Sequence, residues 1–131
     1  MERVILKYKD AKDALKTLKD IFNVPYSIIV RDATIQRFEY TFEAFWKFTQ
    51  EYLKVKEGII ANSPKMCFRE MFSLGFCKEE ETTKLLEMTD KRNETSHTYK
   101  EKVAQSIYDT VEDFSKLMDK ILNSFEGKIN S

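Results

Sequence analysis

The sequence predicts an all-α protein, an antiparallel up-and-down bundle of four to five helices. It contains only three glycines and two prolines in 131 residues, so few positions interrupt a helix. Long stretches place apolar residues three or four apart, the period of one helical face, and no stretch alternates as a strand does. A chain of this length buries its own core, so we expect residues 1–131 to form one domain.

The first two helices are expected at about residues 7–22 and 27–57. The segment at 23–25 contains Pro25 and separates them, and Gly58 is placed to end the second helix. Their predicted core positions are Ala11, Leu15, Leu18 and Phe22 in the first helix, then Ala33, Phe38, Phe42, Phe45, Thr49, Tyr52 and Val55 in the second.

The third and fourth helices are short and are predicted from their starts. Ser63 can cap a helix and Pro64 suits the first helical position, so the third helix runs from there to about Gly75. The fourth begins near Lys78, where three glutamates follow at the positive end of the helix dipole. The last helix has the clearest apolar face: Ala104, Ile107, Val111, Phe114, Met118, Ile121 and Phe125.

The segment between the last two predicted helices carries the candidate site. His97, the only histidine, lies close to Arg92, Asn93 and Tyr99. Histidine titrates near neutrality, and an arginine fork can bind two oxygens of a phosphate or carboxylate. This grouping predicts either acid–base chemistry or a site for an anion.

A break in the helix is needed to bring Arg92 and His97 together. Five residues apart on one helix, they would point about 140° away from each other. Thr98 and Glu101 match a capping box, which would start the last helix at Thr98 and fold the loop around its N-terminus, a natural anion site. The alternative is that Arg92 pairs with a nearby carboxylate such as Glu87 or Glu94, while His97 caps or packs.

Composition excludes several classes of protein. The chain has 22 basic and 22 acidic residues, so bulk charge does not indicate a nucleic-acid coat. Cys67 and Cys77 are too few for a disulfide scaffold or a structural zinc site and are expected to be reduced packing residues in a cytoplasmic protein. The longest aliphatic run, residues 28–30, is too short to span a membrane, and the N-terminus does not resemble a signal peptide.

The side chains of the candidate site match a known motif. In the HEPN superfamily motif, an arginine is followed by a polar residue and, four to six positions after the arginine, by a histidine. Arg92, Asn93 and His97 resemble this motif. Tyr99, two residues after the histidine, resembles the HepT-like branch, also described as nucleotidyltransferase substrate-binding proteins.

Two other segments carry the same resemblance. Residues 31–47 resemble the long helix of that branch, and residues 63–70 resemble the start of its next helix. The similarity covers about residues 26–122. One departure is the start of the fourth helix at residues 78–80, where the family more often has an Asp or Gly turn.

The resemblance implies a HEPN-like helical bundle that forms a homodimer and works without a metal or cofactor. It implies a toxin, a metal-independent endoribonuclease acting on RNA, paired with a small nucleotidyltransferase as antitoxin. The antitoxin would silence the toxin by transferring AMP to Tyr99. The other function attached to the same branch is a non-catalytic substrate-binding subunit of a two-chain nucleotidyltransferase.

The chemistry of the ribonuclease hypothesis fits these residues. His97 would act as general base or acid, Arg92 would hold the charge on the phosphate, and Asn93 would orient one of them. Without the resemblance, Tyr99 is better interpreted as a half-buried packing residue, and a plain helical interaction module stays open. The charges around the site nearly cancel, which favours weak or narrowly targeted RNA binding: Lys84, Lys91, Arg92 and Lys100 against Glu87, Asp90 and Glu94.

Overall fold

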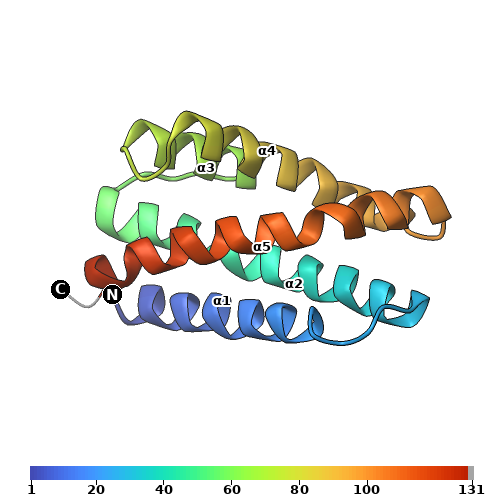
Figure 1. Cartoon of the computed structure of the whole chain (residues 1–131). Helices are drawn as coiled ribbons and strands as arrows, with labels where there is room; N and C mark the ends of the chain where they lie inside the picture. Colours follow the sequence, from blue (N-terminus) through green and yellow to red (C-terminus); the bar gives the residue numbers. More distant parts are fainter. Residues whose placement is uncertain (130–131) are drawn as a thin grey trace.

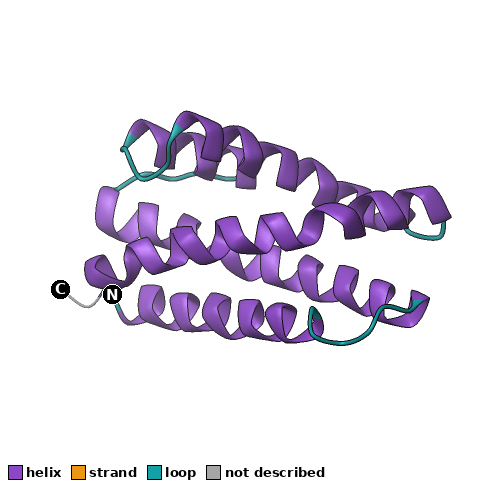
Figure 2. Cartoon of the chain, viewed as in Figure 1, coloured by secondary structure: helices purple, strands orange, loops and turns teal. Residues whose placement is uncertain are grey.

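The computed structural model describes residues 1–129, and within them every regular element is helical (Figure 1, Figure 2). This confirms the predicted all-α bundle. No helix in the described residues is long and apolar enough to cross a membrane. The elements are α1 (Glu2–Ile21), α2 (Ile28–Tyr52), the π-turn η1 (Leu53–Glu57), α3 (Pro64–Ser73), α4 (Glu79–Glu94), the 3₁₀ turn η2 (Thr95–His97) and α5 (Glu101–Ile129).

The helices run up and down, and the connection that carries the candidate site lies at one end of the bundle. α1 packs against α2 and α5, while α3 and α4 pack together as a second pair, with α4 also against α5. The N-terminus of α2 and the α4–α5 connection lie at the same end, the right-hand end in Figure 1. Helices α2 and α5 therefore start side by side and run in the same direction.

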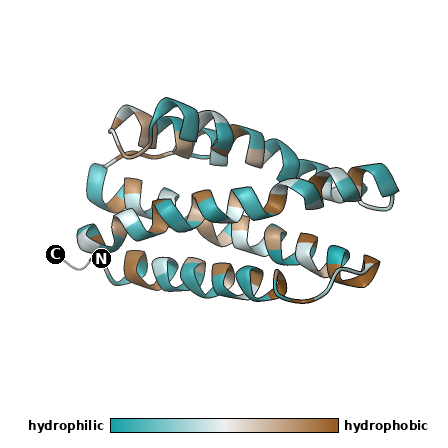
Figure 3. Ribbon diagram, in the orientation of Figure 1, coloured by the Kyte–Doolittle hydropathy of each residue, from teal (hydrophilic) through white to brown (hydrophobic). Residues whose placement is uncertain are grey.

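The core is built from the apolar faces that the sequence predicts, and Figure 3 shows hydrophobic and hydrophilic residues in alternating bands along the helices. All seven predicted core positions of α5 are buried. In α2 the predicted positions from Phe38 to Tyr52 are buried and Ala33 is partly buried, but the prediction is wrong for Val55, which is 43% exposed. The reason is the π-turn after Tyr52, because its wider turn rotates the following residues off the core face.

The predicted helix ends agree with the structure at most positions. Ser63 Oγ accepts a hydrogen bond from the Met66 N–H at 3.2 Å, with Pro64 as the first residue of α3. Gly58 ends the π-turn with a left-handed φ of 69°. The Lys78 N–H donates to Glu81 Oε1 at 2.8 Å at the start of α4. Two helix starts differ: α1 begins at Glu2, earlier than predicted, and α5 begins at Glu101, later than the predicted start at Thr98.

Candidate functional site

Arg92 lies in the last turn of α4, and its guanidinium reaches across to α2. Nη2 lies 3.4 Å from Glu43 Oε1, and Nη1 lies 4.0 Å from Glu39 Oε2. Nη1 also donates to Thr95 Oγ1 at 2.9 Å. Arg92 therefore pairs with acids, but the acids belong to α2, so the predicted partners Glu87 and Glu94 are wrong.

One donor of Arg92 has no acceptor. Its Nε is buried, and within residues 1–129 the structure provides no hydrogen-bond partner for it. A buried donor without a partner carries a cost in free energy. The side chain borders a surface hollow of about 280 Å³ lined by Gln36, Glu39, Tyr40 and Glu43 of α2.

His97 faces a different part of the surface. It is exposed on the turn η2 and borders a hollow of about 290 Å³ between α4 and the start of α5. The charged residues around this hollow are mainly basic, with one carboxylate: Lys91, Lys100, Lys102 and Glu94. Lys91 is held in place there, because its Nζ donates to Ser106 Oγ at 2.8 Å and lies 3.4 Å from Glu94 Oε2.

Arg92 and His97 therefore border separate hollows within one chain. Within a single chain, the prediction that Arg92, Asn93 and His97 fold around the N-terminus of the last helix is therefore wrong. The physical reason is that α4 continues to Glu94 and carries Arg92 toward the two glutamates of α2. Asn93 is exposed, and its backbone carbonyl accepts a hydrogen bond from Ser96 Oγ at 3.3 Å.

The predicted capping box is also wrong. Thr98 has helical backbone angles, φ −70° and ψ −9°, whereas a capping residue is extended. The turn closes instead with the Lys100 N–H donating to the His97 carbonyl at 3.0 Å, and α5 begins at Glu101. Glu101 cannot reach back to Thr98 because its carboxylate is bound by Arg31.

Tyr99 is strongly exposed, so the interpretation of this residue as a half-buried packing phenol is wrong. Its side chain is 78% accessible. Its ring contacts that of His97 edge to face at 6.2 Å between centroids, and Lys100 Nζ lies 5.8 Å from the ring centre. On its other side lies a hollow of about 360 Å³, lined by Asp32, Ile35, Glu39 and Thr98.

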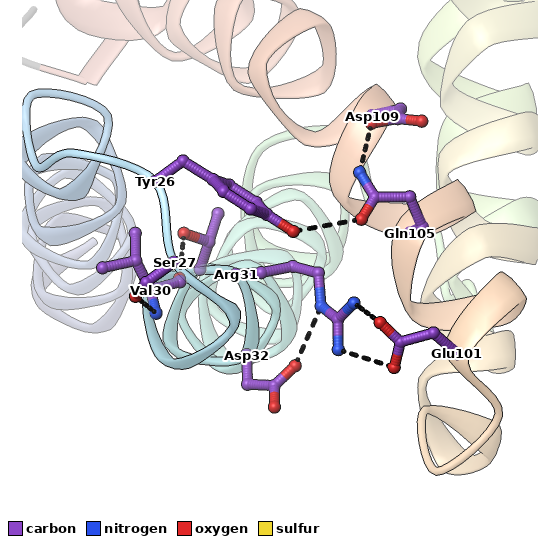
Figure 4. Close-up of polar contacts among 9 residues, drawn as sticks. Tyr26, Ser27, Val30, Arg31, Asp32, Glu101, Gln105 and Asp109 are labelled. Atoms are coloured by element: carbon purple, nitrogen blue, oxygen red, sulfur yellow. Dashed lines mark hydrogen bonds and ion pairs between the residues drawn. The ribbon is translucent and has the colours of Figure 1, made fainter.

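The ion pair of Arg31 and Glu101 is the part of the site that sequence reasoning missed (Figure 4). Arg31 Nη1 and Nη2 donate to the two carboxylate oxygens at 2.5 and 3.3 Å, and Nε donates to Asp32 Oδ1 at 3.2 Å. The hydrogen bonds from Arg31 hold the pKa of the Glu101 carboxyl below its usual range. The available signal was an arginine four positions before Ile35, on a face of α2 that is otherwise apolar.

The two cysteines take no part in this site. Both are buried free thiols, as predicted. Burial raises the pKa of Cys67 to about 11 and that of Cys77 to about 12, so both stay protonated at neutral pH. Neither is therefore a candidate nucleophile.

Two solved structures resemble this fold over nearly their whole length. A crystal structure of a protein from Thermus thermophilus is 44% identical, covers 88% of this chain and 98% of that chain, and has a TM-score of 0.84. A crystal structure of a mutant of the toxin–antitoxin pair MntA-HpeT is 14% identical, covers 97% and 99%, and has a TM-score of 0.80. At that identity the second match supports the fold alone. No curated protein matches the chain.

A family model shows where the chain belongs. The model described as "nucleotidyltransferase substrate binding protein like" matches residues 6–127, which is nearly the whole sequence. The match includes the long helix α2 and the segment from Arg92 to Tyr99, the regions on which the sequence resemblance was based. The chain therefore belongs to the nucleotidyltransferase substrate-binding protein-like family, as the sequence resemblance predicted.

Proposed function

We propose that this chain is a metal-independent endoribonuclease, the toxin of a toxin–antitoxin pair that acts in the cytoplasm. Its activity would be switched off when a separate nucleotidyltransferase, the antitoxin, transfers AMP to Tyr99. The observation that carries the proposal is the lysine-lined hollow around His97. It offers a general acid or base and positive charge for a phosphate at the same place.

Local charge supports RNA binding more strongly than the count along the sequence suggests. Three lysines and one glutamate border the hollow, a clear local excess of positive charge: Lys91, Lys100 and Lys102 against Glu94. Positive charge gathered at one place binds a phosphodiester backbone even when the whole chain is neutral. The exposed ring of Tyr99 beside this hollow adds an aromatic surface on which a base can stack.

The proposed reaction is attack of a ribose 2′-hydroxyl on the adjacent phosphorus. The 2′-oxygen forms a new bond to phosphorus, the 5′-oxygen leaves, and the products are a 2′,3′-cyclic phosphate and a free 5′-hydroxyl. His97 would take the proton from the 2′-hydroxyl or give one to the leaving oxygen. Arg92 would stabilise the charge on the phosphate, and Asn93 would orient the phosphate or His97.

The separation of Arg92 from His97 supports a homodimer as the active form. A single chain offers one histidine, so a separate acid and base require two copies. Two copies paired at this end of the bundle would bring Arg92 of one chain and His97 of the other to one shared cleft.

Tyr99 is well placed for modification. In AMP transfer, the Tyr99 oxygen would attack the α-phosphorus of ATP, lose its proton and release pyrophosphate. The phenol is exposed, and no hydrogen bond from its hydroxyl competes with the reaction among the described residues. The attached nucleotide would add bulk and negative charge beside the His97 hollow, which disfavours RNA.

The test is expression of the chain without any partner, beside His97→Ala. We expect wild-type expression to arrest growth and cleave RNA, and His97→Ala to remain folded and harmless. Lys116→Ala is the matched control, because it removes one exposed basic side chain of α5 away from the site and should stay toxic. Intact RNA and normal growth with the folded wild-type chain would overturn the proposal.

A second function is favoured by a different observation. Arg92 is held by Glu39 and Glu43 of its own chain, which lowers its capacity to bind another anion. This arrangement fits a non-catalytic substrate-binding subunit of a two-chain nucleotidyltransferase. That function predicts nucleotide or substrate affinity that depends on the partner enzyme, and no RNA cleavage by the chain alone.

A further inference from the structure

The segment from Arg92 to Glu101, which carries the candidate site, contacts α2 at both of its ends. At its beginning, Arg92 contacts Glu39 and Glu43. At its end, Glu101 is bound by Arg31 through two hydrogen bonds. The residues between these two attachments include His97 and Tyr99, so the place of both side chains depends on two ion pairs with one helix.

The pair of Arg31 and Glu101 is unsymmetrical in burial. The side chain of Arg31 is 3% exposed, whereas that of Glu101 is 71% exposed. Arg31 is further fixed by Asp32 on its own helix. Arg31 is therefore fixed within α2, whereas Glu101 is an exposed side chain that Arg31 binds and holds in place. A guanidinium that binds both oxygens of a carboxylate fixes the orientation of that carboxylate as well as its distance.

Glu101 lies close in the chain to Tyr99 and Thr98, which line a hollow against α2. Glu101 is the first residue of α5 and follows Tyr99 by two positions. The hollow has Asp32 and Ile35 of α2 on one side and Thr98 and Tyr99 on the other. Asp32 also accepts a hydrogen bond from Arg31, so one guanidinium joins a lining residue of this hollow on α2 to the first residue of α5.

We infer that Arg31 and Glu101 are positioning residues that fix Tyr99 and the adjacent turn for AMP transfer and for the chemistry of His97. This inference rests on the function proposed above. Without the pair, the turn would sample several positions, and the reactive oxygen of Tyr99 would be presented correctly only part of the time. A displacement of about 1 Å can lower the rate of a group transfer by up to about a hundredfold.

The first experiment compares Glu101→Ala with wild-type chain by hydrogen exchange. Glu101 is exposed, so its truncation creates no cavity, and Glu112→Ala is the matched control on an exposed position of the same helix. We expect faster exchange at the amides of residues 98–102 in Glu101→Ala and unchanged exchange in Glu112→Ala. Equal exchange in wild type and Glu101→Ala would overturn the inference.

The second experiment measures AMP transfer to Tyr99 by the cognate nucleotidyltransferase. We expect Glu101→Ala to lower kcat roughly tenfold or more with a smaller change in KM, because positioning acts on the reacting geometry. Arg31→Met should give the same loss, and Arg31→Lys should recover part of it, since it keeps the charge but not the fork. Unchanged kcat in Glu101→Ala would overturn the inference.

The two experiments separate this inference from the proposed function. If wild-type chain receives no AMP and cleaves no RNA, the proposed function fails, and the exchange experiment alone decides whether the pair holds the turn. A fall in kcat that follows an equal fall in the melting temperature of Glu101→Ala would indicate general destabilisation and would also count against a positioning role.

Discussion

Helices α2 and α5 pack along each other, and the contacts at their two ends are chemically opposite. At one end, the ring of Phe125 meets Phe48, Tyr52 and Phe76 edge to face, with centroids 5.2, 4.7 and 5.3 Å apart. At the other end, Arg31 binds Glu101. Residues 101 and 125 are about 36 Å apart along α5 at 1.5 Å per residue.

The difference shows how a stable helical bundle can still present reactive side chains on its surface. Aromatic burial supplies much stability but excludes water, so it cannot carry side chains that must meet RNA or ATP. Ion pairs near the surface add little stability, yet they fix the orientation of the side chains that they join. The aromatic end of the α2–α5 pair therefore contributes mainly to stability, and the ion-pair end fixes the geometry of the site.

The largest expected effect comes from breaking the aromatic end. Phe125→Ala removes a ring that is 1% exposed and contacts three others, so we expect a loss of about 3–5 kcal/mol in the free energy of unfolding. Urea denaturation measures this loss. Exchange at residues 98–102 should change far less than the global stability, when measured under conditions in which the variant stays folded. A loss below about 1 kcal/mol would show that the two ends do not divide these roles.

The contrast also explains which parts of the fold follow from sequence. The face of α5 from Ala104 to Phe125 was predictable, because burial needs only apolar residues at helical spacing. Val55 was not, because a π-turn changes the period without any special residue at that point. Periodicity therefore predicts elements well and fails where the helical period itself changes.

The site followed less completely from sequence. The motif located His97 and Tyr99 on one connection, but it could not show that Arg92 turns toward Glu39 and Glu43, which are distant in the sequence. The competing use of Glu101 illustrates the same limit. A local pattern suggested that Glu101 caps its own helix, and a tertiary partner in α2 bound it instead.

The next largest effect is expected from releasing Arg92. Replacing Glu39 and Glu43 together by Gln removes both carboxylates that face its guanidinium, which frees a positive charge for a phosphate. Affinity for a short single-stranded RNA should increase several-fold, and the salt dependence of binding should steepen by about one phosphate contact. Titrations at several salt concentrations measure both quantities.

The control for this change carries the same alteration in net charge. Glu2→Gln with Glu112→Gln removes two exposed carboxylates away from the site and should alter RNA affinity much less. If the two double variants bind RNA equally well, net charge accounts for the effect, and Arg92 has no special part in binding.

The smallest expected effect is a dependence on acid pH at the site end. Arg31 holds the pKa of Glu101 below its usual range, so the pair contributes fully above the unfolded pKa of that carboxyl. The contribution is lost as pH falls through the lower folded value. At the aromatic end, burial raises the pKa of Tyr52, which therefore stays neutral throughout this range.

Hydrogen exchange during acidification can separate the two ends, once it is corrected for the intrinsic pH dependence of exchange. Protection at residues 98–102 should fall before protection at residues 121–125, because the Arg31–Glu101 pair holds the first group, whereas buried aromatic rings hold the second. Glu101→Ala should lack this early step, since it has already lost the carboxylate. If both ends lose protection together in wild-type chain, acid acts through global unfolding, and the ion pair does not control the site end separately.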